Sequence, residues 1–502
     1  MNSLYSVAEI RAIENATAPL LPPGALMQRA GQAGANVALD LLPFSTTQAK
    51  VLVLAGPGNN GGDALETAAH LAHAGAQVSI LHFDAQGVQS AERAAALQRA
   101  RSSDAKFITI DDPVIASNQW NLVVDGLFGI GLKRPLDGVM RQLVETINRL
   151  RCSILALDVP SGLDADTGTI IGPDGIAVRA THTATFIGDK AGLHTCEGRD
   201  YAGIVEVCKL DLDVAHLPPS QLHLNEVKSF SYHLRVRRHN SHKGSYGNVA
   251  VIGGARGMAG APVLTARTAL YGGAGRVYVL FAEDAPAYDS LHAELMCRPA
   301  DDFDLDTAML VIGPGLGTSQ LAQQLLGRAI ASGSTLLADA DALNILSAEP
   351  ALQAAMTQRA APTVLTPHPL EAARLLGVSA AEIQADRVAS ARKLAAKLNA
   401  TVVLKGSGTV IAAPDGNAVI NTTGNAALAT AGTGDVLSGL CGALLAQGWP
   451  HWEASLAGVW LHGMAADVLV TEGAGPIGLT AGELIPAIRT ALNRMVHHHG
   501  RI

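Results

Sequence analysis

The stretch VLVLAGPGNNGGD, residues 51–63, has the pattern of a buried strand, a glycine-rich turn and the first turn of a helix. Gly56, Gly58 and Gly61 satisfy the spacing G-x-G-x-x-G, and Asp84 follows at the end of the next strand candidate. Such glycines let backbone amides approach a phosphate at the positive end of a helix. The spacing alone fits equally a dinucleotide-binding turn and a tight turn that needs glycine for packing.

The same alternation of β-branched runs and Ala- and Leu-rich amphipathic runs continues on both sides of this stretch. Ahead of it, Ser6 followed by Glu9 is typical of a capping box at the start of a helix. Strand–helix alternation predicts a parallel sheet covered by helices on both faces. The alternation fades near Pro218–Pro219 and returns in the second half. We therefore expect an α/β protein with two three-layer α/β/α domains, Rossmann-like in residues 1–218 and a second one in residues 223–502.

The composition narrows the classes of function. Of the 502 residues, 48% are hydrophobic, which is enough for more than one buried core. The net charge is −8 and there is no basic block, so the chain lacks a general nucleic-acid or anionic-membrane surface. The five cysteines are widely spaced, and no apolar run approaches about 18 residues. We expect a cytoplasmic protein with no nucleic-acid or membrane partner.

Two aspartates lie at the ends of later strand candidates in the first half. Asp125 stands in VVDGLFGIGLKRP and Asp158 stands in LALDVPSGLD. Each of them alone is more often a cap or a turn residue. The carboxyl ends of parallel strands, however, meet at one edge of the sheet, where ligands bind. We therefore expect both aspartates to converge with the glycine-rich turn.

Together, GPGNNGGD, VDGLFGIG and DVPSGLD resemble the NAD(P)H-hydrate epimerases, as does the lead-in LMQRAGQAGANVAL. The resemblance implies potassium ligands in Asn60, Asp125 and Ser161, hard oxygen donors of the kind that such a cation takes. It also implies that two segments and one aspartate bind the hydrate: Asn59, Asn60, Gly61, Gly62, Asp63, Gly129, Ile130, Gly131, Leu132, Lys133, Arg134, Pro135 and Asp158.

The chemistry of such a hydrate gives Asp158 a role. Hydrated nicotinamide carries a hydroxyl on C6, beside the ring nitrogen. Its expulsion leaves a nitrogen-stabilised cation, and re-addition of water from the other face inverts the centre. This reaction needs a general acid/base and a negative environment for the cation. Asp158 is the candidate acid/base.

The second half contains its own chemical signature, NTTGNAALATAGTGDVLSGLCGALLAQG, residues 421–448. The sequence Gly432-Thr-Gly-Asp435 precedes an apolar helical pattern over Val436–Ala446. Successive amides at a helix start can stabilise a developing phosphate charge, and Asp435 can take a proton from an attacking hydroxyl. The alternative is an ordinary helix start in which Thr433 and Asp435 are capping residues.

This signature resembles the GxGD motif of the ribokinase-like superfamily, so the second domain is expected to have a ribokinase-like α/β/α fold. SHKGSYGNVAVIGG, VIGPGLG, DADALNIL, TPHPLEAARLLG and LKGSGTVI narrow the resemblance to the NAD(P)H-hydrate dehydratases over residues 241–485. The resemblance implies hydrate binding by Ala261, Gly317, His368 and Asp435. It implies nucleotide binding by Lys405, Gly406, Ser407, Gly408, Thr409 and Gly434. A single histidine such as His368 is otherwise more often a hydrogen-bonded structural residue.

The two resemblances together imply a bifunctional repair enzyme. One half would equilibrate (R)- and (S)-NAD(P)HX, and the other would dehydrate the S epimer at the expense of ADP, releasing AMP and phosphate. Asp435 would deprotonate the C6 hydroxyl, which attacks the terminal phosphoryl group, and Mg²⁺ would bridge the phosphates. We expect a homo-oligomer acting on small-molecule substrates.

Three other interpretations remain open from the sequence. The second half could phosphorylate a vitamin-precursor alcohol, with the first half a non-catalytic Rossmann-like binding module. The first half could be an interaction module like those of RNA-decapping scaffolds, although NNGGD and Asp125 are intact. A dehydrogenase using Gly56, Gly58, Gly61 and Asp84 would leave the GTGD half unexplained.

Overall fold

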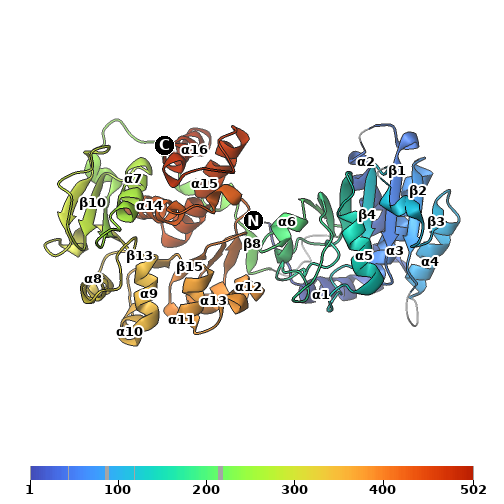
Figure 1. The fold of residues 1–502 in the computed structure, drawn as a ribbon, viewed down its shortest axis with the longest axis horizontal. Helices are drawn as coiled ribbons and strands as arrows, with labels where there is room; N and C mark the ends of the chain where they lie inside the picture. The colour runs from blue at the N-terminus through green and yellow to red at the C-terminus, as the bar shows by residue number, and fades with distance from the viewer. Residues whose placement is uncertain (1, 43, 85–89, 118, 213–218, 501–502) are drawn as a thin grey trace. The chain divides into compact units, whose positions relative to one another are not determined.

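The computed structural model describes residues 2–500, apart from 43, 85–89, 118 and 213–218. It divides into two compact units, Asn2–Leu222 and His223–Ile502, and each is considered by itself (Figure 1). Pro218, the expected end of the first domain, lies outside the described residues.

The N-terminal unit is built on a seven-stranded sheet in the order β3-β2-β1-β4-β5-β6-β7. All its strand pairs are parallel. The strands are β1 (Lys50–Ala55), β2 (Gln77–His82), β3 (Lys106–Ile108), β4 (Leu122–Gly126), β5 (Ser153–Leu157), β6 (His182–Phe186) and β7 (Ile204–Cys208). The helices are α1 (Val7–Thr17), α2 (Ala25–Asp40), α3 (Asn59–His73), α4 (Ala91–Arg101), α5 (Gly138–Ile147) and α6 (Gly198–Tyr201).

Apolar cores lie on both faces of this sheet. One core joins α2, α3 and α4 to the sheet, and the other joins α5 to the opposite face. The blue-to-teal part of Figure 1 shows the strands between these helices. The predicted three-layer arrangement of the first half is therefore confirmed.

The C-terminal unit has a ten-stranded sheet in the order β11-β10-β9-β12-β13-β14-β15-β16-β17-β8. The pairs from β11 to β15 are parallel, and β15, β16 and β17 pair antiparallel. The strands are β8 (Leu222–Leu224), β9 (Asn248–Gly253), β10 (Arg276–Phe281), β11 (Met296–Pro299), β12 (Met309–Ile312), β13 (Leu336–Ala338), β14 (Thr363–Leu365), β15 (Thr401–Leu404), β16 (Val410–Ala412) and β17 (Ala418–Ile420).

Helices cover both faces of this second sheet, which gives three layers again (Figure 1). The main core packs α7, α14, α15 and α16 against one face, while α8 and α13 contact strands from the other side. The helices are α7 (Gly260–Tyr271), α8 (Gln320–Ala331), α9 (Asp341–Ala348), α10 (Pro350–Thr357), α11 (Pro369–Leu376), α12 (Ala380–Ala385), α13 (Arg387–Leu398), α14 (Thr433–Ala446), α15 (His451–Thr471) and α16 (Ala481–His499).

Within the described residues, α15 is the one helix long and apolar enough, by length and composition, to cross a membrane. Sequence reasoning missed it because Glu453, His462 and Asp467 interrupt its apolar run. In the structure 61% of its most apolar window is buried inside the protein, where α15 packs between α14 and α16. The helix therefore serves as a core element of this unit.

Two candidate active sites at the carboxyl edges of the sheets

The glycine-rich turn after β1 is held by close backbone contacts. A Cβ atom on Gly56 would lie 1.7 Å from the carbonyl oxygen of Leu127, and one on Gly61 would lie 1.9 Å from that of Gly56. Both positions therefore need glycine for packing. The buried Arg93 donates hydrogen bonds to the carbonyls of Gly56 and Phe83 beside this turn. Gly56 and Gly61 thus have a packing role in this turn, whereas a Cβ atom on Gly58 would meet nothing within 4 Å.

The expected convergence of the two aspartates with this turn is found in the N-terminal unit. Asp125 is fully buried, and Ser161 donates to it through its hydroxyl at 2.7 Å and its backbone N–H at 2.9 Å. Burial raises the pKa of Asp125 to about 6, against the lowering effect of the hydrogen bonds from Ser161. Asn60, in the first turn of α3, donates from Nδ2 to the carbonyl of Leu157 at the end of β5. Asn60, Asp125 and Leu157 therefore lie at one sheet edge.

The oxygens of Asn60, Asp125 and Ser161 are suited to a potassium ion. Asn60 Oδ1 is buried and has no hydrogen-bond partner among the described residues. A buried acceptor of this kind costs free energy unless a cation or a donor satisfies it. The three residues supply only hard oxygens. The residues present therefore fit the ion that the resemblance implies.

Asp158 follows β5 and is paired with a lysine that sequence reasoning missed. Lys190 has no exposed surface, and its Nζ lies 2.7 Å from Asp158 Oδ1. The other oxygen, Oδ2, accepts a long hydrogen bond of 3.4 Å from the backbone N–H of Ile130. The only signal in the sequence was a lysine shortly after the strand run His182–Phe186. Its partner is 32 residues away, so no local pattern reveals the pair.

Further carboxyl groups surround Asp158. Burial and repulsion from Asp158 and Glu14 raise the pKa of Asp63 well above its ordinary value. Burial, followed by repulsion from Asp158, also raises the pKa of Glu14 on α1. Sequence reasoning included Asp63 but not Glu14. This acidic environment is suited to a cationic intermediate.

The segment Gly129–Pro135 lies in the loop between β4 and α5. A Cβ atom on Gly129 would lie 3.0 Å from Asp158 Oδ2 and 3.3 Å from Asn60, so its start adjoins both side chains. Further along, Gly131, Lys133, Arg134 and Pro135 are exposed, while Leu132 is partly buried. The first part of the predicted segment therefore adjoins the buried acidic group, while most of the remainder is exposed.

In the C-terminal unit, α14 begins at Thr433, three residues before the apolar pattern that predicted it. Its N-cap is Gly432, with a φ of +89° and no side-chain cap, and Thr433 Oγ1 donates back to the carbonyl of Leu428. The capping interpretation of Thr433 and Asp435 is therefore wrong. Burial first, and then repulsion from Asp339, raises the pKa of Asp435 to about 7. Asp435 is thus poised to exchange a proton near neutral pH.

Asp339 accepts hydrogen bonds from two side chains near the start of α14. Its Oδ1 accepts from Lys405 Nζ at 2.7 Å, and its Oδ2 accepts from Ser438 Oγ at 2.7 Å. A Cβ atom on Gly434 would lie 3.4 Å from Lys405 Nζ, so the ammonium adjoins the GTGD backbone. Burial lowers the pKa of Lys405, but attraction to Asp339 and Glu371 outweighs it and raises the pKa overall. Sequence reasoning quoted Asp339 within DADALNIL without assigning it a role.

His368 caps α11 and also lies near this group. Its Nδ1 accepts from the backbone N–H groups of Leu370 and Glu371, so the structural interpretation of this histidine holds. Its side chain is nevertheless 46% exposed. Burial and repulsion from Lys405 lower the pKa of His368. Burial raises the pKa of Glu371, its capping-box partner, to about 7. His368 can therefore cap a helix and still meet a ligand.

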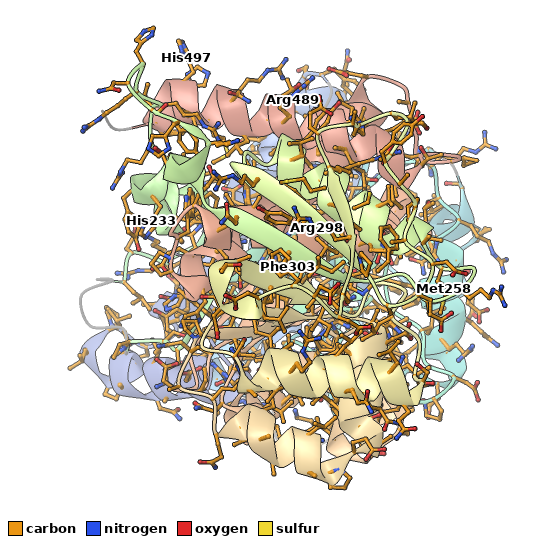
Figure 2. The ribbon with its side chains drawn as sticks, turned by 90° about the vertical axis from the view of Figure 1, so that its left-hand side faces the viewer. His233, Met258, Arg298, Phe303, Arg489 and His497 are labelled. Atoms are coloured by element: carbon orange, nitrogen blue, oxygen red, sulfur yellow. The ribbon has the colours of Figure 1, made fainter. Side chains whose placement is uncertain are left out.

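The other predicted hydrate-binding positions lie on neighbouring loops. The backbone N–H of Gly317 donates to Asp341 Oδ2 at 2.9 Å, which ties the loop after β12 to the start of α9. Ala261, in the first turn of α7, is partly exposed. Met258, labelled in Figure 2, lies on the loop ahead of α7 and is 40% exposed. A Cβ atom on Gly317 would lie 3.7 Å from its methyl carbon, so Met258 adjoins these positions.

The predicted nucleotide-binding segment, Lys405–Thr409, forms the connection between β15 and β16. Gly406 has a φ of +142°, and a Cβ atom there would lie 2.7 Å from the buried guanidinium of Arg387. Thr409 Oγ1 donates to the carbonyl of Gly406 at 3.1 Å, while Ser407 is exposed. The segment is thus a constrained turn that starts beside Gly434, is exposed at Gly406 and Ser407 and is buried again at Gly408.

Family models match both halves of the chain. A model described as "YjeF-related protein N-terminus" matches residues 23–192, and one described as "NAD(P)H-hydrate dehydratase" matches residues 249–489. Among solved structures, an ADP/ATP-dependent NAD(P)H-hydrate dehydratase from Bacillus subtilis, co-crystallised with ATP and Mg²⁺, is 29% identical. The match covers 54% of this chain and 98% of that chain, with a TM-score of 0.47.

Relatives align over nearly the whole chain. A bifunctional NAD(P)H-hydrate repair enzyme of Coxiella burnetii is 36% identical over 503 residues, covering 98% of this chain and 100% of its own length. One from Escherichia coli is 37% identical, covering 93% of this chain and 89% of its own. An ADP-dependent (S)-NAD(P)H-hydrate dehydratase of Neisseria meningitidis is 46% identical over 54% of this chain and 94% of its own. The chain therefore belongs to the family of bifunctional NAD(P)H-hydrate repair enzymes.

Proposed function

We propose that this protein repairs hydrated nicotinamide coenzymes with two active sites. Residues 1–218 equilibrate the R and S epimers of NAD(P)HX, and residues 223–502 dehydrate the S epimer with ADP. The observation that carries the proposal is Asp435, in the first turn of glycine-capped α14, with the ammonium of Lys405 beside the same backbone. The names of relatives that align over both halves support the two activities.

In the epimerase, Asp158 exchanges a proton with the C6 oxygen. Asp158, after taking up a proton, gives it to the hydroxyl, the C6–O bond breaks with both electrons passing to oxygen, and water leaves. The lone pair of the ring nitrogen then forms a C=N⁺ bond. Water adds to the opposite face of C6, the C=N⁺ electrons return to nitrogen, and Asp158 takes the proton back. The carboxyl groups of Asp63 and Glu14 lie near this charge.

Binding of the hydrate involves the residues that adjoin Asp158. We assign this role to Asp63, to the first turn of α3 and to the loop Gly129–Pro135, whose start lies beside Asp158. Asn60, Asp125 and Ser161 would hold a potassium ion, which supplies a fixed positive charge that orients the hydrate.

In the dehydratase, Asp435 takes the proton of the C6 hydroxyl. The hydroxyl oxygen attacks the β-phosphoryl group of ADP, the bond from that phosphorus to the bridging oxygen breaks, and AMP leaves. The amides at the start of α14 and the ammonium of Lys405 stabilise the charge on the transferred group. A pKa of about 7 lets Asp435 act as the base at neutral pH.

The phosphate ester then eliminates. The C6–O bond breaks with its electrons on phosphate, the ring nitrogen forms a C=N⁺ bond, and loss of a proton from C5 restores the dihydropyridine. Phosphorylation thus replaces hydroxide with a better leaving group. Ala261, Gly317 and His368 would bind the hydrate, and the segment Lys405–Thr409 with Gly434 would bind the nucleotide together with Mg²⁺. The ADP dependence named for the N. meningitidis relative supports ADP as the co-substrate.

An absorbance assay tests this function. The protein is mixed with both epimers of NADHX and with ADP or ATP, and NADH is followed at its characteristic band. Complete recovery with ADP supports both activities, whereas recovery of one epimer alone supports only the dehydratase. Absence of recovery refutes the proposal, and a stable phosphorylated product would instead favour a kinase.

A further inference from the structure

Lys190 in the N-terminal unit is completely enclosed by hydrogen-bond acceptors. Its Nζ lies 2.7 Å from Asp158 Oδ1 and 2.8 Å from Thr185 Oγ1, and its other acceptors are the carbonyls of Phe186 at 2.9 Å and Gly188 at 3.1 Å. None of its side chain is exposed. A buried ammonium of this kind is tolerated only because it is paired and hydrogen-bonded. Since its three donors are already used, Lys190 can affect a ligand only through Asp158.

The backbone holds this pair in place at a cost in conformational energy. Asp158 has a φ of +66° and Ile187 has a φ of +69°, a region that side-chain-bearing residues rarely adopt. Each residue is the centre of a tight turn whose N–H···O bond joins its two neighbours, at 2.8 Å around Asp158 and 2.7 Å around Ile187. Backbone strain of this kind persists only where the surrounding structure determines the geometry. These two turns end β5 and β6, the neighbouring strands that carry the pair.

The two oxygens of Asp158 are therefore not equivalent. Oδ1 is bound by Lys190, whereas Oδ2 is directed to the backbone N–H of Ile130 at 3.4 Å. A Cβ atom on Gly129 would lie 3.0 Å from Oδ2, so this oxygen borders the start of the loop Gly129–Pro135. The side chain of Asp158 is 13% exposed, so the carboxyl group is not completely enclosed by protein.

We propose that Lys190 is the positioning residue of the epimerase: by holding Oδ1 of Asp158, it makes Oδ2 the oxygen that exchanges the proton with the C6 hydroxyl. This inference rests on the proposed function of the N-terminal half. Without Lys190 the carboxyl group can rotate, and the proton is no longer presented in one direction. Misplacement of a reacting group by about 1 Å can cost about 100-fold in rate.

The test compares Lys190→Met, Asp158→Asn and the double variant in the full-length protein. The control is Lys209→Met, the same replacement at an exposed lysine of the same unit. Interconversion of purified R and S NADHX is followed by chromatography without nucleotide. We expect Lys190→Met to lower kcat about 100-fold or more while KM changes less than about threefold, and Lys209→Met to match the wild type.

The double variant separates positioning from folding. Lys190→Met leaves the buried carboxylate of Asp158 unpaired and destabilises the unit, whereas Asp158→Asn in the same chain removes that charge. If Lys190 acts through Asp158, the double variant has the same kcat as Asp158→Asn within about twofold. Two measurements on the double variant show that both units are folded. Its unfolding transition reports on the N-terminal unit, and its ADP-driven dehydration of the S epimer reports on the C-terminal unit.

Two results overturn the inference. One is wild-type kcat in Lys190→Met, and the other is a further loss of about 100-fold in the double variant relative to Asp158→Asn, which means that Lys190 acts independently. Failure of the wild-type protein to interconvert the epimers contradicts the proposed function instead, so the two failures are distinguishable.

Discussion

The rate of the dehydratase reaction should depend on pH through the ionisation of Asp435. Substitution of a charged neighbour should shift the pKa of Asp435 and therefore the pH dependence of the rate. Burial and repulsion from Asp339 raise its pKa to about 7. The base must be ionised to act, and with a pKa of about 7 its ionised fraction is about one-eleventh at pH 6 and about ten-elevenths at pH 8. The rate should therefore rise about tenfold between these two pH values.

Asp339→Asn tests the cause of this dependence. The change removes the carboxylate that repels Asp435 and releases Lys405, which lowers the pKa of Asp435. Both effects act in the same direction, so the acidic limb of the rate profile should move to lower pH by about one unit or more. Ser438→Ala is the matched control, since it removes a hydrogen bond to Asp339 without changing any charge, and it should leave the limb in place.

The assay is the initial rate of NADH formation from (S)-NADHX at saturating ADP, measured from pH 5 to 9. ADP itself titrates near this range, but identically for every variant, so the shift between variants reports the protein. An unshifted limb in Asp339→Asn, or a wild-type limb below about pH 5.5, would refute the assignment of Asp435 as a base tuned by Asp339.

Three further predictions concern single substitutions. Asn60→Ala removes the buried Oδ1 and should raise the KCl concentration for half-maximal epimerisation at least about tenfold; an unchanged KCl dependence would argue against a potassium site there. Asp435→Asn should raise the stability of the C-terminal unit at pH 8 by about 1–3 kcal/mol in urea unfolding. A carboxyl group with a raised pKa stabilises the folded state at acidic pH and loses that contribution as pH rises through about 7, so this gain should disappear near pH 4, and a gain independent of pH would contradict it. Gly61→Ala places a methyl group against the carbonyl of Gly56 and should destabilise the N-terminal unit by more than about 2 kcal/mol; unchanged unfolding would show that the turn relaxes.

Local patterns predicted the parts of the fold that depend on neighbouring residues. Ser6 and Glu9 form the expected capping box, because its hydrogen bonds span only three residues. The strand after residue 50 and the strand ends at Asp125 and Asp158 follow from apolar runs broken by glycine or aspartate. The edge where these groups meet then follows from the parallel order of the strands.

The residues that sequence reasoning missed are those that act through distant partners. Lys190 and Asp158 are 32 residues apart, Asp339 and Lys405 are 66 apart, and neither pair has a periodic signal. The apolar pattern at the start of α14 begins only at Val436, whereas the helix begins at Thr433, because a glycine N-cap allows a helix to start ahead of its first apolar residue.

The central claim is that two sites in one chain act on the same damaged coenzyme. The stoichiometry of the products tests this claim most directly. A mixture of (R)- and (S)-NADHX is incubated with excess ADP, and NADH, AMP and inorganic phosphate are quantified as both epimers disappear. The wild-type protein should consume both epimers and release the three products in a 1:1:1 ratio, while Asp158→Ala should stop when the S epimer is exhausted. NADH formed without AMP and phosphate, or complete consumption of the R epimer by Asp158→Ala, would contradict the account.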